Sequence, residues 1–306
     1  MVLSGKKCLL ILSYGGPRNE DEIEAFVSKV TSNKATSAII ESAKKRYLAI
    51  GGRSPVTADT AALAERLSGQ IMDFEVDYAF RFSEPSIEKV VRVKLLQGLR
   101  VFYLLPLYPF YSEWSARGYL EPLMKAAVDT ARATARFFMV SDFYAEESYI
   151  SIWTDLIGNE LDSFKPDITI FTTHSLPLTD RGVSVYERQF KQFARLIAEK
   201  LNLRDYLLAY QSGGRGTSQW LEPDIAATLE MMAGIKRLLV VPAGFLQENL
   251  ETLYDLDIEF RILCEKMGII YRRVNTPLSH PGFADFVKEI LSKDCLWAEV
   301  EFNSVR

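Results

Sequence analysis

Residues 167–177 read DITIFTTHSLP, a mostly apolar run that ends in a polar segment containing His174. The run from Asp167 to Thr172 is apolar on both faces, which is typical of a strand in a parallel sheet that is covered by helices. Ligands of such sheets bind at the carboxyl ends of the strands. The stretch therefore predicts an α/β protein whose chemistry lies in the loops that follow strands.

Similar runs recur along the chain, with helical patterns between them. The expected strands are Cys8–Ser13, Glu75–Phe82, Arg100–Leu105, Arg136–Ser141, Asp167–Thr172, Tyr206–Gln211, Arg237–Val241 and Ile269–Arg272. The expected helices are Asn19–Val30, Thr36–Ala49, Ala58–Ile71, Ser86–Gln97, Tyr149–Ser163, Val185–Lys200, Pro223–Ala233, Leu246–Met267 and Phe283–Ser292. This alternation predicts two Rossmann-like, doubly wound parallel-sheet domains, with the active site in the cleft between them. We expect domains at residues 1–145 and 146–306, with the last helix free to pack back on the first domain.

The composition is that of an ordinary globular protein, with 306 residues, 48% of them hydrophobic and 25% charged. A net charge of −4 provides no basic field for nucleic acid. The three cysteines, Cys8, Cys264 and Cys295, form no disulfide or zinc pattern and favour a reducing compartment. No apolar run is long enough to cross a bilayer. We therefore expect a cytoplasmic protein without a transmembrane segment or a nucleic-acid partner.

The two histidines differ in their setting. His174 directly follows an expected strand, where it could act as a general base or a metal ligand, or be a hydrogen-bonded structural histidine. His280 lies in the turn sequence SHPG, and a solvated loop position accounts for it.

Three carboxylates, Glu251, Asp255 and Glu259, recur every four residues in the expected helix that begins at Leu246. At 100° per residue they fall within about 80° of one helix face. The apolar residues Leu246, Leu250, Leu253, Phe260 and Leu263 are expected on the opposite side. A solvated acidic face explains the pattern fully and is the reading that periodicity alone favours. The functional alternative is a line of oxygen ligands that carries a divalent cation along the helix.

Seven segments, in order along nearly the whole chain, resemble motifs of the ferrochelatase family. They are LSYGGP (12–17), RYLAIGGRSP (46–55), LPLYPFYS (105–112), THSLP (173–177), YQS (210–212), WL (220–221) and GFLQENLETLYDLDIE (244–259). The family commonly has Asp-His where this chain has Glu248-Asn249. The resemblance implies two Rossmann-like domains and an enzyme of haem biosynthesis that inserts Fe²⁺ into a porphyrin.

The resemblance also implies roles for individual residues. His174 and Glu251 match the catalytic residues that face each other across the macrocycle, and Asp255 and Glu259 extend them into an acidic metal-binding line. The residues that match porphyrin-contacting positions of the monoderm-bacterial branch, which uses coproporphyrin III, are Tyr14, Arg46, Tyr47, Ser54 and Tyr119. Iron is the substrate rather than a prosthetic group, and the single cysteine near the C-terminus, Cys295, predicts no iron–sulfur cluster.

Two other functions stay open at this point. A cobalt or sirohydrochlorin chelatase of the same fold would bring more than one histidine to the metal. A non-catalytic porphyrin or haem carrier would need no base opposite a carboxylate. The sequence does not decide between coproporphyrin III and protoporphyrin IX, among Fe²⁺, Zn²⁺ and Co²⁺, or on an oligomeric state.

Overall fold

The computed structural model describes residues 6–130, 135–214 and 219–301, and its tertiary contacts divide the chain into two units. Unit 1 comprises the chain up to Leu107, Trp114–Phe143 and the segment from Ala284 onwards. Unit 2 comprises Tyr108–Glu113 and Tyr144–Phe283. Within the described ranges no helix is long and apolar enough to cross a membrane.

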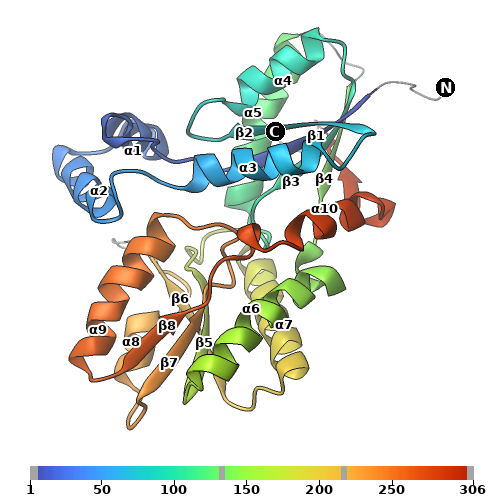
Figure 1. Ribbon diagram of the computed structural model, residues 1–306. Helices are drawn as coiled ribbons and strands as arrows, with labels where there is room; N and C mark the ends of the chain where they lie inside the picture. Colours follow the sequence, from blue (N-terminus) through green and yellow to red (C-terminus); the bar gives the residue numbers. More distant parts are fainter. Residues whose placement is uncertain (1–5, 131–134, 215–218, 302–306) are drawn as a thin grey trace. The chain divides into compact units, whose positions relative to one another are not determined.

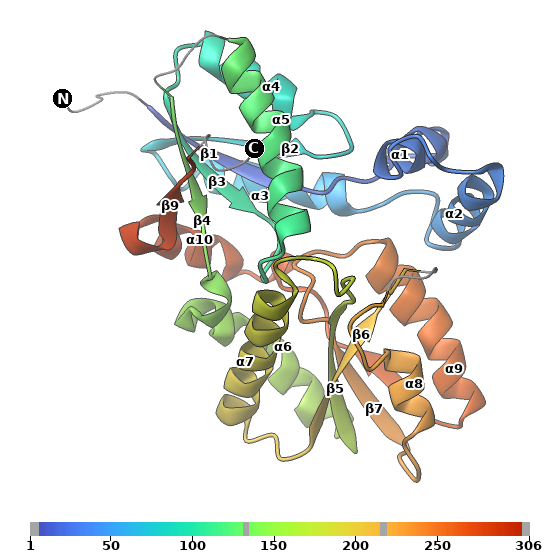
Figure 2. The same ribbon diagram turned by 180° about the vertical axis from the view of Figure 1, so that it is seen from behind.

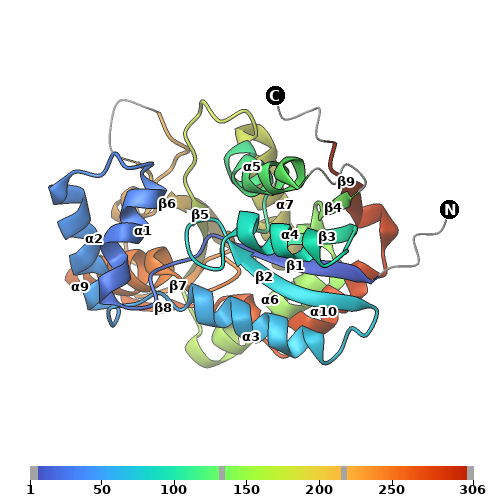
Figure 3. The ribbon, with the colours of Figure 1, turned by 90° about the horizontal axis from the view of Figure 1, so that it is seen from above.

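The sheet of unit 1 has five strands in the order β2-β1-β3-β4-β9. Its strands are β1 (Lys7–Ser13), β2 (Phe74–Phe80), β3 (Val101–Pro106), β4 (Arg136–Val140) and β9 (Trp297–Glu299). Its helices are α1 (Ile23–Val30), α2 (Ser37–Ala49), α3 (Val56–Ser68), α4 (Ile87–Leu96), α5 (Glu113–Asp129) and α10 (Phe283–Leu291). Helix α3 covers one face of the sheet, whereas α4 and α5 cover the other, so that β1 is buried on both faces (Figure 3).

The sheet of unit 2 is wholly parallel, with four strands in the order β6-β5-β7-β8. Its strands are β5 (Ile168–His174), β6 (Tyr206–Gln211), β7 (Arg237–Val241) and β8 (Ile270–Arg273). Helices α6 (Glu147–Phe164) and α7 (Val183–Leu201) cover one face, and α8 (Ile225–Glu230) and α9 (Arg261–Lys266) cover the other (Figures 1 and 2). The central strand β5 is therefore flanked by strands and helices on every side, which fixes the position of its last residue, His174.

All eight expected strands are confirmed, with ends that differ by at most two residues. Among the described residues, one α-helix and one strand were missed. Helix α5 contains Gly118 and Pro122, residues that disfavour a helix locally, and tertiary packing of Leu123 and Ala126 outweighs that preference. Strand β9 has three residues and pairs antiparallel with β4, where the Arg136 guanidinium forms an ion pair with Glu299 at 2.8 Å.

The helix expected from Leu246 to Met267 was wrong in its start and in its winding, because residues 246–249 are not helical. Residues Glu251–Phe260 form a π-helix, which continues into α9. The buried residues Thr252, Leu256, Phe260 and Cys264 recur strictly every four positions. In a helix of 100° per residue such a repeat would drift by about 120° over its length, so a wider turn is needed to keep these side chains on one buried face.

The expected apolar side of this helix is accordingly shifted. Leu256 and Phe260 pack into the core of unit 2 beneath β7 and β8, whereas Leu253 and Leu263 are only partly buried. The acidic residues have the same four-residue spacing as the buried ones and each stands one position ahead of a buried residue. The acidic line therefore runs next to the buried face of the helix. The expectation from α-helical geometry had placed the acidic line on the side opposite the apolar residues.

Candidate active site

His174 is the last residue of β5, at the carboxyl end of one of the two inner strands of unit 2. Its Nδ1 forms a hydrogen bond with the Ser175 backbone carbonyl. Because a carbonyl oxygen only accepts, Nδ1 carries a proton and Nε2 is the nitrogen that gains or loses one. The hydrogen bond thus fixes both the ring orientation and the tautomer of the neutral side chain.

The Nε2 atom of His174 lies 3.4 Å from Oε1 of Glu251, the first residue of the π-helix. Burial opposes protonation of His174, but the Glu251 carboxylate, the Ser175 carbonyl and Asp255 outweigh it and raise the pKa of His174 to about 9. At neutral pH the two side chains therefore form an imidazolium–carboxylate pair. The two side chains are 34% and 32% exposed, so both can be reached by a small ligand.

The structure places His174 and Glu251 side by side, whereas the resemblance implies that they face each other across a macrocycle. A planar ring needs about 3.5 Å on each of its faces, which requires about 7 Å between the flanking groups. The observed separation of 3.4 Å leaves no such space. The two side chains are therefore direct neighbours in this structure.

A buried tyrosine supports the histidine from α7. The Tyr186 hydroxyl donates to the His174 carbonyl at 3.0 Å and forms a hydrogen bond with the Thr173 hydroxyl. Burial raises the pKa of Tyr186, so the hydroxyl stays protonated and keeps its role as a donor. Gly244 packs directly on Thr173, where a Cβ would come within 1.9 Å of Oγ1. These contacts hold the end of β5 in place.

The three acidic residues of the π-helix differ in their surroundings. Glu251 pairs with His174, and Asp255 accepts a hydrogen bond from the Ser212 hydroxyl at 2.5 Å. Glu259 is exposed to solvent. Among the residues that the structure describes, no group of three or more His, Cys, Asp or Glu side chains is placed to hold a metal ion together.

Gln211 is a residue of this site that the sequence reasoning did not select. It is 1% exposed, pairs with His174 in the parallel ladder between β5 and β6, and donates from Nε2 to the Glu251 carbonyl at 3.4 Å. Gln211 ends an expected strand, as His174 nearly does, so the same criterion could have identified it from the sequence.

His280 lies in a turn, as expected, but its side chain is only partly exposed. Its Nδ1 accepts a hydrogen bond from the Gly282 backbone N–H at 3.1 Å, and its side chain is 21% exposed. It therefore fixes a turn.

The residues expected to contact the porphyrin all belong to unit 1. Tyr14 follows β1 and packs edge-on against Phe26 of α1 and Phe82, with ring centroids 6.3 and 4.7 Å apart. Tyr47 in the last turn of α2 packs edge-on against the same Phe26 at 6.3 Å. Tyr14 is 41% exposed whereas Tyr47 is buried, so Tyr14 offers the accessible ring of this aromatic cluster.

Arg46, Ser54 and Tyr119 have different degrees of exposure. Arg46 is partly buried in the last turn of α2. Ser54 is 4% exposed and packs against Gly16, where an added Cβ would come within 2.4 Å of the serine. Tyr119 of α5 is 5% exposed, and burial raises the pKa of its hydroxyl, which therefore stays neutral.

Arg81, directly after β2, is a second residue that the sequence reasoning missed. Its guanidinium lies 4.8 Å from the centroid of the Phe82 ring and 5.9 Å from that of Trp114. Gly118 permits this position, because a Cβ there would come within 2.0 Å of the guanidinium. Among the described residues no carboxylate forms an ion pair with Arg81, so its charge is available for an anionic ligand.

An open cavity of about 530 Å³ lies in unit 1 near the start of α3. Ser54 is the member of the expected site that lines it, together with Arg18, Arg53, Tyr78 and Glu84. Arg18 is engaged by Glu22, at 2.5 Å. Tyr14, Arg46, Tyr47 and Tyr119 do not line this cavity.

Comparison with known proteins shows similarity over almost the whole chain. The family model for ferrochelatase matches residues 6–295. The chain is 30% identical to the coproporphyrin III ferrochelatase of Oceanobacillus iheyensis over 93% of this chain and 96% of that protein. It is 29% identical to coproporphyrin III ferrochelatase 2 of Bacillus cereus, over 93% of each chain, and 29% identical to the ferrochelatase of Herpetosiphon aurantiacus, over 95% and 99%.

Solved structures share the fold at low sequence identity. The structure of SirB from Bacillus subtilis with Fe³⁺ aligns with a TM-score of 0.63 at 13% identity, over 95% of this chain and 99% of that chain. CbiX, described as the terminal enzyme for biosynthesis of sirohaem in denitrifying bacteria, aligns with a TM-score of 0.57 at 11% identity, over 94% and 98%. These alignments establish a chelatase-like fold with two parallel-sheet units.

Proposed function

This chain belongs to the ferrochelatase family, enzymes that insert ferrous iron into a porphyrin, and on that premise we propose that its substrate is coproporphyrin III and that His174 and Glu251 carry the reaction. The observation that supports these roles is the pair itself. A histidine of fixed tautomer at a strand end lies 3.4 Å from a carboxylate that opens a π-helix, and both are accessible. A carrier protein has no need of such a pair.

Metal insertion exchanges two protons of the porphyrin for one Fe²⁺. A free porphyrin loses the protons of its two inner N–H groups, and the four ring nitrogens then bind one Fe²⁺, so two protons must leave for each dication that enters. Imidazole and carboxylate suit ferrous iron without binding it as tenaciously as thiolates bind other metals. The site therefore needs a base for protons and a ligand that releases iron, and the pair offers both.

The raised pKa of His174 couples the removal of the pyrrole protons to the arrival of Fe²⁺. In the resting enzyme Glu251 stabilises the proton on Nε2. A dication that approaches Glu251 replaces the imidazolium as the partner of that carboxylate and repels the proton from His174. The neutral Nε2 then accepts a proton from a pyrrole N–H, and passes it to solvent through its exposed edge before the second transfer.

Asp255 and Glu259 are proposed to supply iron to Glu251. Glu259 is exposed, Asp255 is partly buried and bound by Ser212, and Glu251 is beside His174, so the line runs from solvent to the pair. Oxygen ligands spaced along one helix side bind a divalent cation singly and therefore weakly, which favours transfer over trapping.

Coproporphyrin III carries four propionates and protoporphyrin IX carries two, so the former needs more cationic and hydroxyl partners. Unit 1 offers Arg81, which forms no ion pair with any carboxylate in the described part of the chain, together with Arg46, Ser54 and the accessible ring of Tyr14. Charge-assisted hydrogen bonds from guanidinium to carboxylate are among the strong ones. Several relatives that match nearly the whole chain are named coproporphyrin III ferrochelatases, which supports the same choice.

We propose the cytoplasm as the compartment and a mechanism without an iron–sulfur cluster. The three cysteines are free thiols, with Cys8 and Cys264 buried and Cys295 exposed. Burial raises the pKa of Cys8 to about 12, which disfavours the thiolate that metal binding requires. Cell fractionation and an iron and sulfide analysis of the purified protein test these two statements.

The deciding experiment is anaerobic insertion of Fe²⁺ into coproporphyrin III and protoporphyrin IX, followed by absorbance, with Co²⁺ and sirohydrochlorin as alternative substrates. We expect the highest kcat/KM with Fe²⁺ and coproporphyrin III. His174→Ala should abolish insertion while the porphyrin still binds, because binding depends on a large contact area rather than one imidazole. Unchanged turnover in His174→Ala would refute the assignment, and a preference for sirohydrochlorin would refute the substrate.

A further inference from the structure

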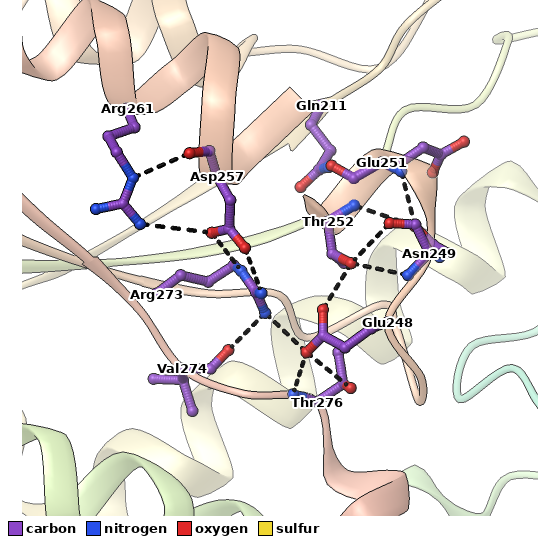
Figure 4. A network of polar contacts seen from close by, with 10 residues as sticks. All are labelled: Gln211, Glu248, Asn249, Glu251, Thr252, Asp257, Arg261, Arg273, Val274 and Thr276. Carbon is purple, nitrogen blue, oxygen red and sulfur yellow. Dashed lines mark hydrogen bonds and ion pairs between the residues drawn. The ribbon is translucent and has the colours of Figure 1, made fainter. Parts of the chain in front are cut away.

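A buried arginine of β8 binds both ends of the segment that carries the acidic line. Arg273 is 6% exposed, and its Nη1 donates to Oε1 of Glu248 at 3.0 Å, just before the π-helix. Its Nε and Nη2 donate to the two carboxylate oxygens of Asp257 at 2.9 and 2.7 Å, near the end of the π-helix (Figure 4). The bidentate geometry fixes direction as well as distance.

Glu248 connects Arg273 to the first turn of the π-helix through hydrogen bonds. Its Oε2 accepts a hydrogen bond from the Thr252 hydroxyl at 2.7 Å, and its Oε1 also accepts from the backbone N–H and the hydroxyl of Thr276 at 3.1 and 3.0 Å. Coulombic attraction to Arg273 and these hydrogen bonds outweigh burial and lower the pKa of Glu248. Glu248 thus stays ionised and fully hydrogen-bonded.

Asn249 completes the connection to Glu251. Its Oδ1 accepts hydrogen bonds from the backbone N–H groups of Glu251 and Thr252 at 2.8 and 3.1 Å, while its own N–H donates to the Thr252 hydroxyl at 2.9 Å. These bonds satisfy N–H groups that the start of a helix leaves unpaired. A continuous chain of contacts therefore leads from Arg273 through Glu248 and Thr252 to the backbone of Glu251 (Figure 4).

The arrangement also separates two kinds of carboxylate. Residues 248–259 contain five acidic side chains, which repel one another when all are ionised. Arg273 neutralises Glu248 and Asp257, and Arg261 adds a hydrogen bond to the Asp257 carbonyl at 2.9 Å. The remaining three are Glu251, Asp255 and Glu259, which are the carboxylates of the acidic line.

We propose that Arg273 is a positioning residue for iron insertion, which holds Glu251 beside Nε2 of His174 by binding Glu248 and Asp257. This inference rests on the proposed function of Glu251 and goes beyond it, since Arg273 bonds to Glu248 and Asp257 rather than to Glu251 or His174. Groups that orient a metal-binding residue commonly change metal affinity by about 10- to 100-fold when they are altered. The expected consequence is therefore a defect toward Fe²⁺ that the porphyrin does not share.

The test compares Arg273→Lys with Arg272→Lys. Lysine keeps the charge at position 273 but loses the fork that binds two carboxylates at once. Arg272 lies on the same strand and binds Glu160 at 3.1 Å, with no bond to the π-helix, so it is a matched control. We expect Arg273→Lys to raise the KM for Fe²⁺ about tenfold at an unchanged KM for porphyrin, and Arg272→Lys to match the wild type.

A change in the KM for Fe²⁺ without a change in the KM for porphyrin distinguishes a positioning role from a loss of stability alone. Partial unfolding lowers the amount of active enzyme, and hence the apparent kcat, but leaves the KM values of the folded enzyme unchanged. An Arg273→Lys enzyme whose KM for Fe²⁺ is that of the wild type, or whose two KM values rise together, would overturn the proposal.

A second pair of variants decides the matter if Arg273→Lys does not fold. Thr252→Val removes the hydroxyl that joins Glu248 to Asn249 at constant shape, whereas Thr252→Ser keeps it. We expect the valine variant to raise the KM for Fe²⁺ and the serine variant to leave it unchanged, and equal values for the two would overturn the proposal.

Amide hydrogen exchange supplies a readout that needs no activity. In Arg273→Lys the N–H groups of Glu251 and Thr252 should lose protection, while strands β5 to β7 keep theirs. Protection at Glu251 and Thr252 equal to that of the wild type would overturn the positioning role. A wild-type enzyme that fails to insert iron would instead refute the proposed function, and the exchange experiment would still test the contact chain.

Discussion

Replacement of Glu251 by Gln removes the negative charge beside His174 at nearly constant shape, and we expect the pKa of His174 to fall from its value of about 9. The two charged atoms are 3.4 Å apart. Coulomb attraction at that distance is about 1.2 kcal/mol in water and about 5 kcal/mol at an effective dielectric constant of 20. At about 1.4 kcal/mol per pKa unit, these limits correspond to roughly 1 and 3.5 units.

Because solvent partly screens the two charges, the decrease in the pKa of His174 should lie between these limits. The side chains of His174 and Glu251 are 34% and 32% exposed, so the higher value is too large. We expect the pKa of His174 to fall by about 2 units in Glu251→Gln.

The assay is a pH titration of the histidine ring protons by NMR. The chain has two histidines, and His280→Gln removes one signal and so assigns the other. Glu259→Gln is the control, because that carboxylate is exposed and makes no contact with His174. A decrease of less than about 0.5 unit in Glu251→Gln would refute the electrostatic basis of the proposed mechanism.

The ion pair between His174 and Glu251 also stabilises the folded protein, by an amount that depends on pH. The pKa of His174 in the folded protein, about 9, is higher than its ordinary value of 6.5. The stabilisation is therefore fully present below pH 6.5 and is lost as the pH rises through about 9. Thermal melts across this window should show a larger decrease in Tm for the wild type than for Glu251→Gln, and equal decreases would contradict this sign.

Three further outcomes are expected. Asp255→Asn and Glu259→Gln should raise the KM for Fe²⁺ and leave kcat within about twofold, as measured by anaerobic saturation kinetics, and an equal loss in kcat would favour a direct role in the chemistry. Arg46→Ala should lower kcat/KM for coproporphyrin III by about tenfold or more and have less effect on protoporphyrin IX, whereas equal effects would remove Arg46 from propionate recognition. Leu256→Ala, at a fully buried position of the π-helix, should lower the free energy of unfolding in urea by about 2–5 kcal/mol, and the partly buried Leu253→Ala should cost less.

Much of the fold follows from the sequence because the strands are local, strongly patterned features. The apolar runs of β1, β5 and β7 are buried on both faces, and this composition is sufficient to predict central parallel strands. The position of His174 at a strand end and the four-residue spacing of Glu251, Asp255 and Glu259 are likewise visible in the sequence. Resemblance of these segments to a known family then gave their chemistry, which spacing alone left open.

The elements that sequence reasoning missed depend on contacts between distant segments. Strand β9 has three residues and little pattern of its own, and it exists through pairing with β4. Helix α5 forms despite Gly118 and Pro122 because its apolar side is buried. Local preference is worth about 1–3 kcal/mol at such residues, and burial of several side chains exceeds it.

Local pattern is enough to predict eight strands, the residue types of the site and the spacing of the acidic line. It does not predict that the line is wound as a π-helix, that Glu251 meets His174 at 3.4 Å, or that Arg273 binds Glu248 and Asp257. The reason is physical. Periodicity encodes which side of an element is buried, whereas the distance between two charges on different elements depends on how the whole core packs.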